Sequence, residues 1–124
     1  TKVSRSVLPE RLEYATAVRA GSVGNALVAA LLTDDLELVA ELIEQDGYHE
    51  PYREKLVPHL KILRELGHKV GAKGTYLSGA GPTVMTLIAP EKMASFIKAA
   101  REHGLTGEFN QLAVDQKGAR SEEI

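Results

Sequence analysis

A glycine-rich loop at residues 78–82, with the sequence SGAGP, carries the clearest chemical signal in the chain. Glycine tolerates positive φ and lets a ligand approach the main chain, so such a loop can present several backbone N–H groups to one anion. No Gly-Lys-Ser/Thr follows, and the next segment has strand character, so the loop is neither a Walker A loop nor a dinucleotide fingerprint. The residues alone leave two interpretations open: an anion-binding loop, or a glycine-rich hairpin bend, which is the commoner feature.

A second candidate is the segment HEPYR at residues 49–53. The planar guanidinium of Arg53 suits a carboxylate or a phosphate, and a desolvated charge-assisted hydrogen bond of that kind contributes about 1.5–3 kcal/mol. The alternative is an Arg53 that pairs with Glu50 or Glu54 on a solvated surface and contributes little. Without further context, the solvated pair is the favoured interpretation.

The amino-terminal residues Thr1, Lys2 and Arg5 are a third candidate, because Thr1 and Arg5 share a face if the segment is a strand. Other chemistry finds little support. The four histidines lack a metal-binding spacing, and Ser78 lacks the G-x-S-x-G context of a nucleophile elbow. We therefore expect no metal site and no catalytic base in this chain.

Hydrophobic periodicity predicts the elements that position these residues. Apolar positions at three- and four-residue steps predict a helix over residues 12–32, in which Gly21 and Gly24 require close packing or a bend. A capping-box-like pair, Asp34 and Glu37, predicts the start of a second helix. Further helices are expected over residues 58–66, with Gly67 as the stop, and from Pro90 to the stop at Gly104.

Residues 71–77 and 83–88 have strand character on either side of the glycine-rich loop and predict two antiparallel strands. Residues 109–114 predict another strand, and residues 2–7 are expected to be extended. The resulting order predicts an α+β fold: a ferredoxin-like split βαβ sandwich with helices on one face of an antiparallel sheet and extra helices in the first crossover.

The composition bounds the class of protein. The 124 residues, 44% hydrophobic and 26% charged, indicate one globular domain. A formal net charge of −2 gives no electrostatic footprint for nucleic acid or a membrane surface, and the absence of cysteine excludes disulfides and thiolate chemistry. Apolar runs are shorter than the roughly 20 residues of a membrane helix, and no signal sequence is evident, so we expect a soluble, cytoplasmic protein.

Taken together in their order along the chain, three segments carry a resemblance that covers nearly the whole sequence: TKVSR at residues 1–5, HEPYR at 49–53 and LSGAGPT at 77–83. The SGAGP stretch is similar to the third motif of the GHMP small-molecule kinases. The other two segments resemble the homoserine-kinase branch of that family. The chain, residues 1–124, is thereby identified as similar to the C-terminal domain of these enzymes, whose fold is ferredoxin-like.

The resemblance implies transfer of the ATP γ-phosphoryl group to the hydroxyl of L-homoserine, a step of threonine biosynthesis, with Mg²⁺. It implies that Arg5 and Arg53 clamp the substrate carboxylate and that Thr1 lies near the transferring phosphate. The loop formed by Ser78, Gly79, Ala80 and Gly81 would face the nucleotide phosphates. A homodimer is left open.

Family members also carry a P-x-x-x-G-L-G-S-S-A type loop in an N-terminal ATP-binding domain, and nothing in this sequence resembles it. We therefore expect that domain to be absent from this chain, to be the partner of the chain in the full-length parent, and to bind most of the ATP and Mg²⁺. The chain alone is expected to be inactive. Two alternatives are another GHMP kinase, for a sugar or isoprenoid precursor, and a non-catalytic ferredoxin-like module that binds an anion.

Overall fold

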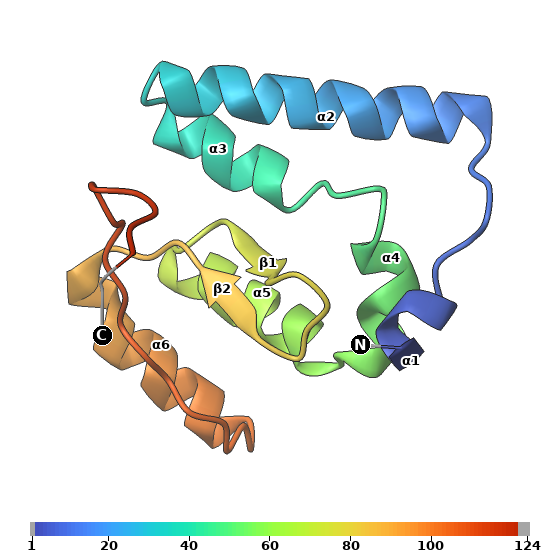
Figure 1. Cartoon of the computed structure of the whole chain (residues 1–124). Coiled ribbons are helices and arrows are strands. Elements are labelled where there is room, and N and C mark those ends of the chain that lie inside the picture. The colour runs from blue at the N-terminus through green and yellow to red at the C-terminus, as the bar shows by residue number, and fades with distance from the viewer. Residues whose placement is uncertain (1, 122–124) are drawn as a thin grey trace.

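Helices dominate the fold, and one short hairpin of strands lies among them. A computed structural model describes residues 2–121 of the chain. In chain order its elements are α1 (Lys2–Ser6), α2 (Tyr14–Leu32), α3 (Leu36–Ile43), α4 (Glu50–Arg53), the 3₁₀ turn η1 (Glu54–Leu56), α5 (His59–Val70), β1 (Thr75–Leu77), β2 (Val84–Thr86) and α6 (Pro90–Glu102). Figure 1 shows α1 and α4 side by side at one end of the molecule, next to the loop that joins β1 to β2.

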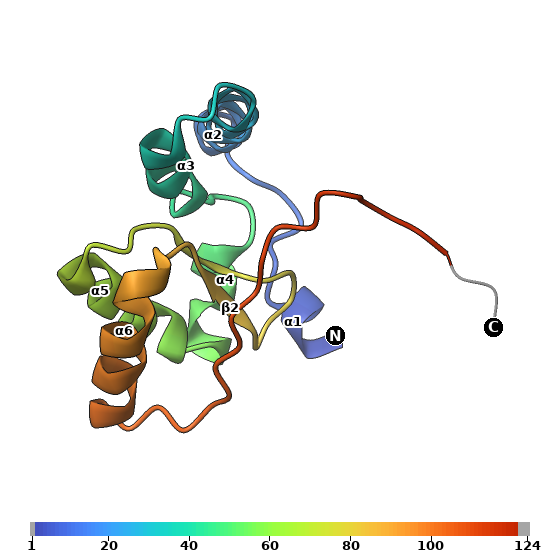
Figure 2. The same ribbon diagram turned by 90° about the vertical axis from the view of Figure 1, so that its left-hand side faces the viewer.

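The two strands are antiparallel, with Thr75 opposite Thr86 and Leu77 opposite Val84. The two strands and their antiparallel pairing are confirmed, but the predicted bounds, residues 71–77 and 83–88, are too long: each strand has three residues. Helices α5 and α6 pack together, and α5 also contacts both strands of the hairpin. Figure 2 shows α6 along its length in front of α5. The mixed helix and strand class that the sequence predicts is thereby confirmed.

Two apolar clusters hold these elements together. In the first, Leu63 and Leu66 of α5 pack against Phe96 and Ala100 of α6. The second comprises Val57, Leu60 and Leu77. Partly buried Val84 of β2 contacts both clusters, so the core is continuous from α6 to the end of β1. Because Leu77 directly precedes the glycine-rich loop, the chain is anchored to the core immediately before the loop begins.

Helices α2 and α3 form a hairpin that stands beside the rest of the fold (Figure 2). The carboxylate of Asp35 caps α3 by accepting a hydrogen bond from the Leu38 amide, so the cap lies one residue later than the predicted Asp34. Gly21 meets the Tyr48 hydroxyl, whereas Gly24 has open space where a Cβ would lie. The close approach of another backbone is therefore wrong for Gly24, and at Gly21 the close neighbour is a side-chain hydroxyl instead of backbone. The alternative, a bend in the helix at these glycines, stays a prediction.

By length and composition alone, α2 could cross a membrane. The lengths of the apolar runs did not predict this, because Arg19 and Asn25 interrupt them. One such helix near the N-terminus is weak evidence for a membrane span, since a buried core helix of a soluble protein or a signal sequence can have the same length and composition. Within α2 itself, Ala20 and Ala30 are the buried residues, and most of the helix is exposed. In this fold α2 lies against α3.

Two predicted strands are wrong. Residues 2–6 form the helix α1 rather than extended chain, and residues 109–114 have no regular secondary structure. In a split βαβ sheet the first strand lies beside the fourth, so the fourth has no partner once the first segment is helical. Leu112 and Val114 are consequently exposed. Contacts between α1 and the glycine-rich loop, described below, override the extended pattern of the first segment.

The predicted end of α6 is confirmed, and the predicted end of α5 is wrong. Helix α6 begins at Pro90 and ends just before Gly104, as predicted. The predicted stop of α5 at Gly67 is wrong: α5 continues to Val70 and ends at Gly71, which has φ +73°. Gly67 lies inside the helix, where a Cβ would come within 2.6 Å of the Ala72 carbonyl oxygen. The glycine is there because backbone passes close by, not because the helix ends.

Candidate functional site

The glycine-rich loop between β1 and β2 is held through its carbonyl oxygens. Arg53 Nη1 donates to the oxygen of Gly79 at 3.0 Å, and the Ser4 hydroxyl donates to the oxygen of Ala80 at 2.8 Å. His59 Nε2 lies 2.8 Å from the oxygen of Pro82. Within the loop, Gly81 N donates to the Ser78 oxygen and Ser78 N to the Thr83 oxygen.

The amides of Gly79 and Ala80 are left without an acceptor among residues 2–121. Gly79 has φ +56° and is exposed, and no atom lies within 4 Å of the position its Cβ would take. Backbone N–H groups presented this way at an open surface are what an anion such as phosphate requires. The loop can therefore donate to a ligand without losing a hydrogen bond of its own.

Arg53 lies on the short helix α4 and is buried. Its Nε donates to the Ser4 carbonyl oxygen at 3.1 Å and its Nη1 to Gly79, so one guanidinium joins α1 to the loop. The interpretation of Arg53 as a solvated partner of Glu50 or Glu54 is thereby wrong. Among the described residues no acceptor pairs with Arg53 Nη2, so this nitrogen is available to donate to a ligand.

Of the N-terminal candidates, Arg5 lies within the described residues and Thr1 does not. Arg5 is exposed in the last turn of α1, next to Ser4, so the chain brings it near Arg53 and the loop. Its side chain has no assigned partner within residues 2–121. Thr1 lies outside the described residues. The structure thus brings together Arg53, Gly79 and Ala80 directly, and Arg5 by its neighbour in sequence.

The start of α4 is fixed by Asp46. Its carboxylate accepts hydrogen bonds from the amides of Tyr48, His49 and Glu50, at 3.0, 3.0 and 2.6 Å. Burial raises the pKa of this carboxyl, but the three amide donors and the nearby His49 outweigh burial and hold the pKa below its ordinary value of 3.8. A charged Asp46 is therefore part of the folded state and sets the position from which Glu50 and Arg53 project.

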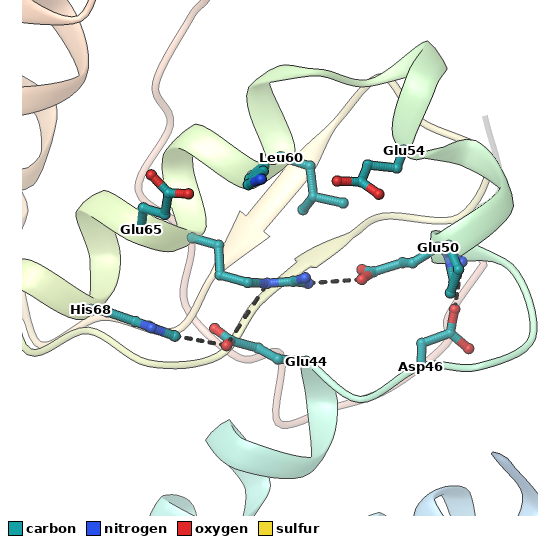
Figure 3. Close-up of a pocket in the computed structure, with 10 residues that line it drawn as sticks. Glu44, Asp46, Glu50, Glu54, Leu60, Glu65 and His68 are labelled. Carbon is teal, nitrogen blue, oxygen red and sulfur yellow. Dashed lines mark hydrogen bonds and ion pairs between the residues drawn. The ribbon is translucent and has the colours of Figure 1, made fainter. Parts of the chain in front are cut away.

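A cavity of about 400 Å³ lies beside α4 and α5, and charged groups dominate its lining. Figure 3 shows Glu44 and Glu50 facing each other across it, with a guanidinium between them. That group is Arg64, whose Nη2 lies 2.7 Å from Glu50 Oε2 and whose Nε lies 3.8 Å from Glu44 Oε2. His68 Nε2 lies 2.7 Å from the same oxygen of Glu44.

No group of three or more potential ligands in residues 2–121 could hold a metal ion. The two carboxylates on either side of Arg64, those of Glu44 and Glu50, already interact with Arg64 and with backbone amides. The described part of the chain thus offers two neighbouring backbone amides and a guanidinium to a ligand, and no group of residues within it that could hold a metal ion.

Sequence reasoning missed the residues that support the loop and β1. Ser4 and His59 bind the loop, whereas Glu44 and Arg64 bind Thr75 of β1. Each acts across a long separation in sequence, so no local spacing marks it. Glu50 had a local signal, since it stands three residues before Arg53 on one helical turn. That spacing places both side chains on one side of α4. It does not show that Glu50 binds the Leu77 amide while Arg53 binds the Gly79 oxygen.

Comparison with known proteins supplies the remaining context. The family described as GHMP kinases C terminal matches residues 27–105. A homoserine kinase of Lactococcus lactis subsp. cremoris (strain MG1363) is 49% identical over 123 residues, which are 99% of this chain and 42% of that protein. A homoserine kinase of Lactobacillus acidophilus is 45% identical over 120 residues, or 97% of this chain and 42% of that protein.

Among solved structures, a homoserine kinase from Cytophaga hutchinsonii ATCC 33406 superposes with a TM-score of 0.73 at 30% identity. The match covers 82% of this chain and 32% of that one. The chain thus spans less than half the length of the curated relatives it matches.

Proposed function

The chain belongs to the GHMP kinase family, of which it carries the C-terminal domain, and on this basis we propose that it is the substrate-binding part of an ATP-dependent homoserine kinase. The reaction is transfer of the ATP γ-phosphoryl group to the side-chain hydroxyl of L-homoserine, within threonine biosynthesis in the cytoplasm. A longer protein that contains these residues would supply the ATP-binding domain. Residues 1–124 by themselves would then have little or no activity.

The observation that carries the proposal is the state of the glycine-rich loop. Its carbonyl oxygens are occupied by Arg53, Ser4 and His59, whereas the amides of Gly79 and Ala80 have no acceptor among the described residues. Phosphoryl transfer depends mostly on positioning and on stabilising charge on phosphate oxygens, and fixed amide donors supply both. We assign Ser78, Gly79, Ala80 and Gly81 to the side of the site that faces the nucleotide phosphates.

The substrate carboxylate is assigned to Arg53 and Arg5. Backbone oxygens of Ser4 and Gly79 fix the guanidinium of Arg53, and a fixed fork loses less entropy on binding a carboxylate than a free side chain does. Arg5 is exposed in the last turn of α1, next in sequence to Ser4, and would supply the second positive charge. Thr1 is assigned a place near the transferring phosphate on the strength of the family resemblance alone.

Mg²⁺ would reach the site with ATP, where it neutralises charge on the phosphate oxygens. We propose that it is held mainly by groups outside this chain. The residues of this chain would orient the acceptor amino acid and exclude water from it, with no side chain of residues 2–121 assigned as a catalytic base.

The test is a coupled ATP assay on the longer protein that contains this chain, with L-homoserine as acceptor and with a sugar or mevalonate as comparison. Turnover that depends on homoserine, together with its absence in the 124-residue chain, is the expected result. Turnover with a sugar or mevalonate instead would assign the chain to another GHMP kinase. Binding of inorganic phosphate without turnover on any acceptor would favour a non-catalytic anion-binding module.

A further inference from the structure

The outer edge of β1 is completed by side chains instead of a neighbouring strand. Strand β1 pairs with β2 along one edge, and its other edge carries the amides and carbonyl oxygens of Thr75 and Leu77, of which both amides and the Thr75 oxygen are bound by side chains. Glu44 Oε1 accepts from the Thr75 amide at 2.8 Å, and Glu50 Oε1 accepts from the Leu77 amide at 2.6 Å. Arg64 donates to the Thr75 oxygen from Nε at 3.0 Å and from Nη2 at 2.7 Å.

These three side chains are also joined to one another. Arg64 lies between the two carboxylates, 2.7 Å from Glu50 and 3.8 Å from Glu44. Both oxygens of Glu50 have a donor: Leu77 N for Oε1 and Arg64 Nη2 for Oε2. A buried carboxylate is expensive unless it is both paired and hydrogen-bonded, so this arrangement tolerates little movement of Glu50.

The position of Glu50 matters because of where β1 leads. Leu77 is the last residue of β1, and the glycine-rich loop begins with the next residue. On the same short helix, Arg53 holds the oxygen of Gly79. Helix α4 therefore holds the residues on both sides of Ser78, the first by its amide and the second by its carbonyl oxygen.

We infer that Glu50, with Arg64 as its counter-ion, is a positioning residue that fixes where the loop presents the amides of Gly79 and Ala80. This rests on the proposed function of the loop, since it assigns Glu50 a role in aligning a phosphate-facing element. Glu50 does not touch the phosphate itself. It acts through Leu77, and loss of this hydrogen bond would shift the amides of Gly79 and Ala80 from their positions. A misplacement of about 1 Å in an active site can lower the rate about 100-fold.

The informative variant is Glu50→Gln. A glutamine has the same shape, and its oxygen can still accept from Leu77, but its NH₂ group then faces the donors of Arg64. The matched control is Glu65→Gln, since Glu65 lines the same cavity from α5 and is exposed. In the longer protein we expect Glu50→Gln to lower kcat about tenfold or more while the KM for homoserine changes by less than about threefold. Glu65→Gln is expected to change neither value.

A second measurement separates this inference from the proposed function. On the 124-residue chain, amide NMR compares Glu50→Gln with the parent. We expect faster hydrogen exchange at the Leu77 amide and shifted resonances of the Gly79 and Ala80 amides in the variant. Added inorganic tripolyphosphate should also shift those two amide resonances less in the variant than in the parent. If the longer protein has no homoserine-dependent turnover, the proposed function fails, and the NMR result still decides the role of Glu50. Where Glu50→Gln does not fold, Arg64→Lys keeps the charge but loses the fork, and the same changes at Leu77, Gly79 and Ala80 are expected.

The inference is overturned if the loop amides keep their shifts and their tripolyphosphate response in a folded Glu50 or Arg64 variant. It is also overturned if Glu50→Gln leaves kcat within about twofold of the parent, or if Glu65→Gln lowers kcat equally.

Discussion

Arg53 Nη1 donates a hydrogen bond of 3.0 Å to the carbonyl oxygen of Gly79, and the two residues are 26 positions apart in the chain. The Nε of the same guanidinium donates to the Ser4 oxygen, 49 positions away. One buried side chain therefore determines how α1, α4 and the glycine-rich loop lie relative to one another.

The first prediction concerns Arg53→Ala. The change leaves the oxygens of Ser4 and Gly79 without their donor, and each unsatisfied group costs about 1–3 kcal/mol, so we expect a loss of about 2–4 kcal/mol in the free energy of unfolding. Urea-induced unfolding measures this. Arg19→Ala is the control, because Arg19 is exposed on α2 and should shift stability by less than about 0.5 kcal/mol. Equal losses in the two variants would contradict the prediction.

In the longer protein, Arg53→Ala should also lower kcat/KM for homoserine about tenfold or more, because the carboxylate loses its fixed partner. Arg53→Lys, which keeps the charge without the planar fork, should recover only part of this loss. Kinetics identical to the parent in both variants would show that Arg53 serves the fold alone.

Ser4→Ala tests the link between α1 and the loop. The Ser4 hydroxyl is buried and donates to the Ala80 oxygen at 2.8 Å, so its removal should cost about 1 kcal/mol of stability. Ser6→Ala is a matched control on the same helix, since Ser6 makes an exposed local bond to the Val3 oxygen. Thermal unfolding of the two variants, compared with the parent, checks the difference, and an unchanged midpoint in Ser4→Ala would contradict it.

Two glycines in helices should respond in opposite directions to alanine. In Gly67→Ala the new Cβ would lie 2.6 Å from the Ala72 oxygen, and the backbone must move, at a cost of about 1–3 kcal/mol. In Gly24→Ala the Cβ meets open space, and the higher helix propensity of alanine should stabilise the chain by about 0.5–1 kcal/mol. Denaturant midpoints of both variants measure the signs, and a stabilised Gly67→Ala would be inconsistent with the packing of α5.

Acid should weaken the start of α4 through Asp46. The pKa of Asp46 is lowered in the folded state, so its charged form contributes stability above the ordinary carboxyl pKa of 3.8, and this contribution is lost as pH falls from 3.8 through the folded value. Asp46→Asn should therefore be destabilised by about 1 kcal/mol near neutral pH, since it keeps only part of the cap.

The measurement is urea unfolding of the parent and Asp46→Asn at neutral pH and at successive pH values below 3.8. The difference between the two proteins should shrink as the pH falls, because the parent loses the charge that the variant never had. A difference that stays constant across this range would mean that Asp46 does not supply the acid dependence.

Much of the fold follows from local signals. Proline at the start of α6 and glycine after its end mark that helix, and the loop between two β-rich runs marks the hairpin, because both depend on backbone preferences that a few residues decide. Residues 2–7 show where such signals fail. Their extended pattern is overridden by Ser4 and Arg53, whose contacts join segments far apart in sequence.

The candidate site divides in the same way. The glycine-rich loop and Arg53 stand out by residue type, so sequence alone identifies them as candidates. Their support could not be found from spacing, because Glu44 and Arg64 reach β1 from two other helices or helix ends, and no local pattern encodes which backbone group a carboxylate will meet. The sequence therefore predicted the loop and Arg53 as candidate ligand-binding groups. It did not predict Glu44 and Arg64, the side chains that hold β1 in position.

Helix α4 has four residues, far too few to be stable as an isolated helix in water. It persists because Asp46 holds its amides at one end, while Glu50 and Arg53 hold β1, α1 and the loop. Opening any one of these contacts removes support from the rest, so α1, α4 and the loop form a single cooperative unit, or foldon, whose amides should exchange with solvent in one event. We therefore expect the part of the chain assigned to substrate to order and disorder as a whole.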